Sequence, residues 1–322
     1  RFVGELVGVV TATDFFVSGI ATFASDVGIA GTLTYEDVTN IDSVGIITAR
    51  SNILVGSGIT LSPDGDGSFT GIITASNFLK ADGSAVGGLS SDSDDNTIGG
   101  TNAGDSITTG TKNTVIGKDA GTAITTGAQN VALGYQALDA DTTGGNNVAI
   151  GEGALSANTT ASNNSAVGRY ALNENVTGIE NTAMGLSALR ANTASYNTAF
   201  GKSALENNTS GNPNDAFGAY ALDANTTGAN NIAVGYNALT TNTTASNNVA
   251  VGNHALGANT TGANNTGLGH QTLKTNTTAS NNTGVGYYAL YANTTGANNT
   301  ALGHGSLDAN TTASDNTAVV LF

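Results

Sequence analysis

The chain contains no cysteine and no tryptophan, and only two of its 322 residues are proline. Without cysteine it can form no disulfide and has no thiolate for catalysis or metal binding. Aromatic residues make up 6% of the chain and charged residues 10%, less than half of the usual share of charge. These shortages exclude a disulfide-stapled fold and argue against an ordinary globular domain.

Basic side chains are also scarce, because nine Lys and Arg stand against 24 Asp and Glu, a formal net charge of −15. Proteins that bind nucleic acid or anionic lipid present clusters of basic residues, so we expect neither partner. No apolar run approaches the ~20 residues that a membrane-spanning helix requires, and we expect no membrane insertion.

Glycine and small apolar residues are abundant instead. The chain has 44 glycines, and 39% of its residues are hydrophobic, mostly small or β-branched. Such residues cannot build one thick core, but they can build a thin core that is repeated many times.

An asparagine recurs in steps of 17 residues, with one step of 16 from Asn181 to Asn197. The 14 anchor positions are Asn96, Asn113, Asn130, Asn147, Asn164, Asn181, Asn197, Asn214, Asn231, Asn248, Asn265, Asn282, Asn299 and Asn316. The unit has the form N-T-A-V-G-x-x-A-L-x-A-N-T-T-G-A-N. A fixed period indicates a stacked repeat architecture, in which each unit buries its apolar face against its neighbours.

Short apolar pieces bounded by Gly, Thr and Asn predict strands and turns within each unit. Gly, Thr and Asn are poor helix formers, and no apolar stripe runs at helical spacing. The sequence therefore predicts an all-β fold, a narrow β-solenoid or β-roll of stacked 17-residue coils. At ~4.8 Å per coil, the stack would form a rod of roughly 65 Å.

Three rows of residues are expected to hold the coils together. The anchors should hydrogen-bond along the axis as stacked amides do; they include Asn231, Asn248 and Asn265. A glycine four residues later should allow a positive φ or a close backbone approach; this row includes Gly235, Gly252 and Gly269. A leucine four residues after the glycine should lie in the core; this row includes Leu239, Leu256 and Leu273.

A second apolar row, the residue before each glycine, is also expected in the core. It comprises Leu133, Ile150, Val167, Met184, Phe200, Phe217, Val234, Val251, Leu268, Val285 and Leu302. Each large side chain contributes ~1.5–3 kcal/mol when buried, whereas ordering each residue of a coil costs ~1–2 kcal/mol. Association that buries one face of every coil would offset part of this cost, so the sequence favours an oligomer.

The unit N-T-A-V-G-x-x-A-L resembles two known patterns. One is the head repeat of trimeric autotransporter adhesins, a left-handed parallel β-roll that assembles as a homotrimer. The other is a repeat in the tail-fibre proteins of tailed phages, especially marine cyanophages. Elements of the form G-I-I-T-A, at residues 45–49 and 71–75, look like cyanophage fibre shafts and favour the phage.

The resemblance implies a structural fibre in the virion tail, built as an intertwined parallel homotrimer. It would act as a spacer and could attach to the host surface. Its implied partners are further copies of itself, other tail or baseplate proteins, and a glycan or protein on the host cell. The alternatives are a bacterial trimeric adhesin and another extracellular or cell-surface filament subunit.

The chain divides into three parts. Residues 1–88 are expected to form a β-rich fibre shaft, because their G-I-I-T-A elements are irregularly spaced. Residues 89–95 would form a polar, acidic joint, and residues 96–322 the solenoid.

The two positions after each glycine, which we call the slot, vary from unit to unit. They hold six of the nine tyrosines and all three histidines. The candidate receptor-binding residues are Tyr236, His254, His270, Tyr287, Tyr288 and His304. His270, Tyr287 and His304 share one slot position in consecutive units and would lie ~5 Å apart, as an aromatic stripe on which a sugar could stack. The alternatives are a surface or inter-chain contact without a ligand, and a metal on the axis of a trimer.

Other motifs favour structural roles. Residues 64–68, D-G-D-G-S, resemble the start of a calcium loop, but Ala75 replaces the bidentate Glu at the twelfth position, so a plain turn is favoured. Several Asn-Thr-Thr triplets match the glycosylation sequon but are more simply explained as turns. They begin at Asn158, Asn225, Asn242, Asn259, Asn276, Asn293 and Asn310.

No catalytic set is recognisable. Asp139 and Asp141 lie near Glu152 in the sequence, but scattered acids also keep a rod soluble. We expect no enzyme activity, no cofactor and no metal site. Recurring Thr-Thr pairs leave an ice- or surface-binding solenoid as a third alternative, although such arrays usually place T-x-T on one strand.

Overall fold

The computed structural model describes residues 90–320. The predicted shaft, residues 1–88, and its Asp64 turn motif lie outside the described residues. The described chain contains strands and turns and no helix. The strands are β1 (Ser90–Ser91), β2 (Thr97–Gly99), β3 (Thr114–Ile116), β4 (Val131–Leu133), β5 (Val148–Ile150), β6 (Ser165–Val167), β7 (Thr182–Met184), β8 (Thr198–Phe200), β9 (Asn214–Phe217), β10 (Asn231–Val234), β11 (Val249–Val251), β12 (Thr266–Leu268), β13 (Thr283–Val285), β14 (Thr300–Leu302) and β15 (Thr317–Val319).

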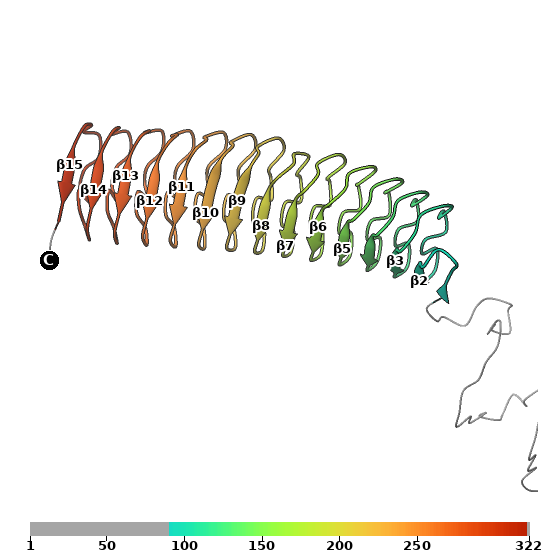
Figure 1. Ribbon diagram of the computed structural model, residues 1–322. Coiled ribbons are helices and arrows are strands. Elements are labelled where there is room, and N and C mark those ends of the chain that lie inside the picture. The colour runs from blue at the N-terminus through green and yellow to red at the C-terminus, as the bar shows by residue number, and fades with distance from the viewer. Residues whose placement is uncertain (1–89, 321–322) are drawn as a thin grey trace, which may run out of the picture. The chain divides into compact units, whose positions relative to one another are not determined.

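All of these strands belong to one sheet, in which their order is that of the chain (Figure 1). From β2 onward each strand pairs in parallel with the same strand of the next coil, so that Ala233 lies opposite Ala250, and Ala250 opposite Gly267. The first strand, β1, pairs with β2 in the antiparallel sense. The predicted all-β solenoid of 17-residue coils is therefore confirmed.

Hydrogen bonds between coils continue beyond the sheet. The backbone N–H of Leu239 donates to the carbonyl of Ala255, at 3.1 Å, and that of Thr226 donates to Thr243, at 2.8 Å. Bonds of this kind recur from coil to coil on the turns as well as on the strands. Buried backbone groups need partners, and the neighbouring coils supply them here.

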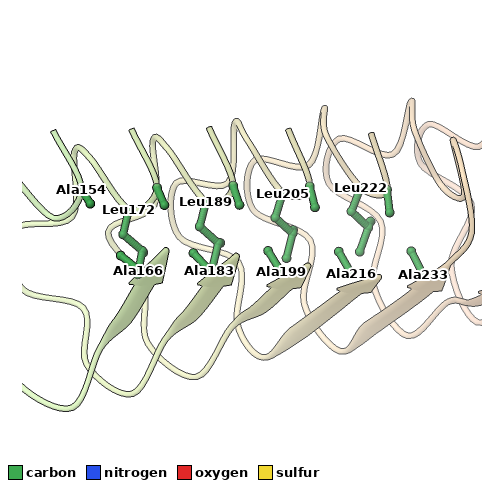
Figure 2. Close-up of a cluster of buried hydrophobic side chains, with 14 of the residues drawn as sticks. Ala154, Ala166, Leu172, Ala183, Leu189, Ala199, Leu205, Ala216, Leu222 and Ala233 are labelled. Atoms are coloured by element: carbon green, nitrogen blue, oxygen red, sulfur yellow. The ribbon is translucent and has the colours of Figure 1, made fainter. Parts of the chain in front are cut away.

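The core is a row of leucines between two rows of alanines. In Figure 2 each labelled leucine points toward the alanine of a strand, as Leu189 and Leu205 do. The leucines of this row from Leu138 to Leu290 are fully buried. The alanines fill the rest of the interior, the strand alanine Ala233 on one side and Ala238, beside the leucine, on the other.

The residue before each glycine does not lie in the core, and this prediction is wrong. Leu133, Phe217 and Leu302 are 42%, 40% and 47% exposed. Side chains on a strand alternate between its two faces. Since the anchor asparagine and the central alanine point inward, the residues on either side of that alanine must point outward.

The glycine that follows each strand from β2 to β14 lies close to the next coil. Gly235 has a φ of +132°, and a Cβ added there would lie 2.6 Å from the carbonyl oxygen of Gly252. Contacts of this length recur along the row. The glycines therefore allow both the close backbone approach and the positive φ that the sequence predicted.

The anchor asparagines form a buried side-chain ladder. The backbone N–H of Asn248 donates to Oδ1 of Asn231, at 3.0 Å, and the Nδ2 of Asn231 donates to the carbonyl of Ala245, at 2.9 Å. Each anchor thus satisfies backbone groups of the coils beside it. Such bonds between buried groups are costly to lose, because the remaining partner stays unsatisfied.

The asparagines of the Asn-Thr-Thr triplets form a second amide ladder. The sequence had predicted only a turn for these asparagines. The Nδ2 of Asn242 donates to Oδ1 of Asn225, at 2.9 Å, and to the carbonyl of Ala245, at 3.1 Å. Both asparagine side chains are buried. In the folded solenoid the buried amides of this ladder, which do not include the partly exposed Asn310, are therefore not accessible to glycosylation.

An aspartate stands at the accepting end of each amide ladder. Asp92 accepts two hydrogen bonds from the first anchor, at 2.9 and 2.8 Å. Asp141 accepts from Asn158, at 2.8 Å, in the second ladder. A third, exposed ladder of asparagines beside the anchors ends where Asn298 donates to Asp315, at 3.0 Å. A carboxylate accepts hydrogen bonds without requiring a further acceptor, so it suits the last place in a ladder.

Candidate functional site

The slot lies on the turn that follows each strand, directly after the glycine. Its side chains point away from the core, so Tyr135, Tyr236 and Tyr287 are 44%, 48% and 47% exposed. The side chains that differ from coil to coil therefore lie along one edge of the solenoid, whereas the interior positions hold the same few residue types in every coil.

The position after each core leucine belongs to the same edge, and sequence reasoning missed it. It holds Arg190, Lys274 and Tyr291 in different coils, and the ring of Tyr291 lies 4.7 Å from that of the slot residue Tyr288. We call the slot and this position together the slot edge. The variation of this position from unit to unit was the signal that could have identified it.

The three residues that the sequence placed in one row do stack. The rings of His270 and Tyr287 are 5.2 Å apart and 9° from parallel, and those of Tyr287 and His304 are 5.1 Å apart and 4° from parallel. Both faces of Tyr287 are therefore occupied by imidazole rings. A sugar cannot stack on this central face, and the row presents ring edges and polar tips to solvent instead.

Two further rings complete this cluster. Tyr288 lies 4.3 Å from Tyr287 and 6.0 Å from His270, at steep angles to both rings. Tyr291 lies 4.7 Å from Tyr288, and the ammonium group of Lys274 lies 5.7 Å from the ring centroid of Tyr291. The cluster thus combines stacked rings, phenol hydroxyls, imidazoles and one ammonium group.

Tyr236 and His254 form a separate, smaller cluster with Tyr220. The ring centroids of Tyr220 and Tyr236 are 6.1 Å apart, and those of Tyr236 and His254 are 5.6 Å apart, both edge to face. Burial lowers the pKa of His254, and the positive charges of Lys274 and His270 lower it further. The six candidate residues therefore lie on one edge but divide into two ring clusters.

Closer to the N-terminus the slot edge is charged and internally paired. Cations cover its tyrosines: Lys118 lies over Tyr135, Arg169 over Tyr170 and Lys202 over Tyr220, at 5.8, 4.6 and 5.2 Å. Arg169 also pairs with Glu152, at 3.1 Å. These contacts satisfy the polar groups within the chain and leave this half less free to bind a ligand.

The three acids that lie near one another in the sequence take different roles. Glu152 forms the exposed ion pair with Arg169, and Asp139 follows a core leucine on the slot edge. Asp141 is buried, and its Oδ1 accepts from the backbone N–H of Gly144, at 3.2 Å, as well as from the second amide ladder. The structure thus divides these acids among an ion pair, the slot edge and a buried ladder.

Burial raises the pKa of Asp141 to about 7, against the effect of its two hydrogen bonds. The folded state therefore holds this proton more tightly than the unfolded state does. The protonated Asp141 side chain therefore adds to the free energy of unfolding fully below about pH 4. This contribution falls by up to about 1.4 kcal/mol per pH unit as the pH rises, and it is lost at about pH 7. We expect Asp141→Asn to remove this part of the pH dependence, which urea unfolding of both proteins at pH 4.5 and 7.5 would measure. Parallel pH profiles would contradict the prediction.

Within residues 90–320, no group of three or more His, Cys, Asp or Glu side chains is placed to hold a metal ion. In the same part of the chain, no helix is long and apolar enough to cross a membrane.

Comparisons of the chain with family models, curated proteins and solved structures find no match. The class of protein therefore follows from the fold itself. The parallel one-strand coils, the buried amide ladders and the leucine row define a β-solenoid repeat protein.

Proposed function

We propose that this protein is a structural fibre of a phage tail, which acts as a spacer and can contact the host surface. The proposal rests mainly on one observation, which is that consecutive coils are joined by hydrogen bonds along the whole described solenoid. Backbone and side-chain hydrogen bonds link each coil to the next from Asp92 to Asp315. A solenoid braced in this way resists bending and local unfolding, because each coil is held by both neighbours.

Two further features support a tail fibre over other rods. The repeat unit and the G-I-I-T-A elements at residues 45–49 and 71–75 resemble those of phage tail fibres. The slot edge displays aromatic and cationic side chains outside the core, where they can vary without disturbing the stack. The proposed partners are other tail or baseplate proteins and a glycan or protein of the host surface.

The location in the virion is testable by imaging. Antibodies against residues 90–320, applied to purified phage particles that contain this chain, should decorate tail fibres in electron micrographs. Particles of a phage that lacks the gene serve as the control. If the antibodies decorate host cell surfaces but not the phage particles, the adhesin or filament alternative is favoured instead.

We further propose that the fibre is a parallel homotrimer whose copies pack through the outer face of the sheet. That face carries the apolar row before the glycines, and the rings of Phe200 and Phe217 stack on it, 5.2 Å apart. Met184, Phe217 and Leu302 on this face are 41%, 40% and 47% exposed. A row of partly or largely exposed apolar side chains of this kind favours association.

Phe217→Asp should dissociate the trimer and leave the coil folded, because the side chain points away from the core. In sedimentation equilibrium we expect the full chain to have three times the mass of one 31.8 kDa copy, and the variant to have a lower mass. Thr261→Asp, on an exposed turn away from the sheet, is the matched control. A folded wild-type monomer would refute the trimer, whereas a trimeric Phe217→Asp would refute only this interface.

A further inference from the structure

The slot edge has one long stretch without acidic residues. Between Asp223 and Asp308 the chain contains no Asp or Glu, although it has 24 of them in all. The same stretch carries Lys274 and the three histidines. In a chain of net charge −15, the aromatic cluster thus has an acidic neighbour on the slot edge only at its C-terminal limit, where Asp308 shares a coil with His304.

The ring geometry in this stretch favours polar contacts. Because His270 and His304 cover both faces of Tyr287, a ligand reaches the row at the ring edges. Imidazole N–H groups, phenol hydroxyls and the ammonium of Lys274 are hydrogen-bond donors. The donors recur at intervals of about one coil, ~5 Å along the axis, so a ligand that matches them must be elongated and rich in acceptors.

We infer that the cluster of His270, Lys274, Tyr287, Tyr288 and His304 binds an acidic glycan of the host surface, whose carboxylate or sulfate groups lie along the stacked rings. This inference rests on the proposed attachment function and names its ligand class. Charge-assisted hydrogen bonds to such groups are shorter and stronger than those to neutral hydroxyls. The sugar rings between the acidic groups contact the exposed ring edges.

The surrounding charges permit such a ligand. Charges farther away than about 8–10 Å are largely screened at physiological salt, and Asp223 lies three coils before His270, roughly 14 Å along the axis. Asp308 lies in the same coil as His304, with its carboxylate beside Gly305, so the acidic groups of the ligand would be bound mainly on the side of His270 and Lys274. A nucleic acid fits less well, because its dense phosphates require clusters of Lys and Arg, and this stretch has a single Lys and no Arg.

Binding can be measured with the full chain and defined oligosaccharides. The acidic probes are hexagalacturonate and a sulfated heparin hexasaccharide, and the neutral probe of equal length is maltohexaose. By calorimetry at about 50 mM salt we expect at least one acidic probe to bind, at least about tenfold more tightly than maltohexaose, and the binding to weaken at about 500 mM salt. The triple variant His270→Gln, Lys274→Gln, His304→Gln should lose at least about tenfold in affinity.

The matched control is Lys202→Gln, which removes a cation from the N-terminal half of the same edge, and it should bind like the wild type. If neither acidic probe binds, or if maltohexaose binds equally well, the inference is overturned. An equal loss with Lys202→Gln would show that the binding depends on general charge and would overturn it as well. None of these outcomes affects the imaging of the fibre in the virion, so the two proposals can fail separately.

Discussion

Leu239→Asp is expected to unfold the middle of the rod and to lower the free energy of unfolding by more than about 4 kcal/mol. Leu239 is fully buried between the alanine rows. Its replacement removes apolar contacts and places a carboxylate among alanine and leucine side chains, without a cation to pair with it. Because each coil is held mainly by its two neighbours, the loss should spread to the adjacent coils.

Tyr236→Ser, three residues away, is the matched control. Tyr236 is 48% exposed, and its ring lies edge to face with the rings of Tyr220 and His254 on the slot edge. Thermal melts followed by circular dichroism should show a large fall in melting temperature for Leu239→Asp and little change for Tyr236→Ser. Similar losses for both variants would mean that the inner and outer faces have been assigned wrongly.

Gly235→Ala should be nearly as damaging, although it adds only one methyl group. The new Cβ would lie 2.6 Å from the carbonyl oxygen of Gly252, and the φ of +132° is one that side chains rarely adopt. Backbone strain and steric overlap together should cost about 3 kcal/mol or more. Urea unfolding of the wild type and the variant measures this cost.

The control for this prediction is Gly257→Ala. Gly257 follows a core leucine, at a position where neighbouring coils carry Thr240 and Lys274, and it has no positive φ. An added Cβ there would meet its nearest neighbour, the carbonyl oxygen of His254, at 3.2 Å, which calls for only a small adjustment. We expect a change within about 1 kcal/mol. If Gly235→Ala were equally mild, the glycine row would not be required by the close approach of the coils.

The core and the slot edge follow different rules. Core positions repeat because a leucine or alanine in one coil must fit the same residue in the next. Slot-edge positions project into solvent, so His270 and Tyr287 can replace one another from coil to coil and still stack. This separation would let the rod carry the proposed binding surface without loss of stability.

Much of the fold is determined by the sequence alone. The 17-residue spacing of the anchors requires coils that stack in register, because identical residues then meet and their amides and backbones hydrogen-bond along the axis. The recurring glycine indicated a close backbone approach, since only glycine lacks a Cβ. The same period placed His270, Tyr287 and His304 in one row about 5 Å apart, as the structure has them.

Only the tertiary structure decided which face of the strand points inward. The order N-T-A-V-G allows either the alanine or the larger residue beside it to face the core, and a shift of one residue exchanges the two faces. The buried Asn231 and Ala233 settle this choice. They leave the pre-glycine row outside, although its size had suggested a core position.

Tertiary contacts also decided features that have no local signal. Leu239 has a φ of +51°, a conformation that a bulky residue adopts only when its surroundings impose it. The asparagines of the Asn-Thr-Thr triplets became a buried ladder because the neighbouring coils supply their acceptors. Whether the rings beside Tyr287 cover its faces or leave them open depends on side-chain angles in adjacent coils, which a repeat period cannot specify.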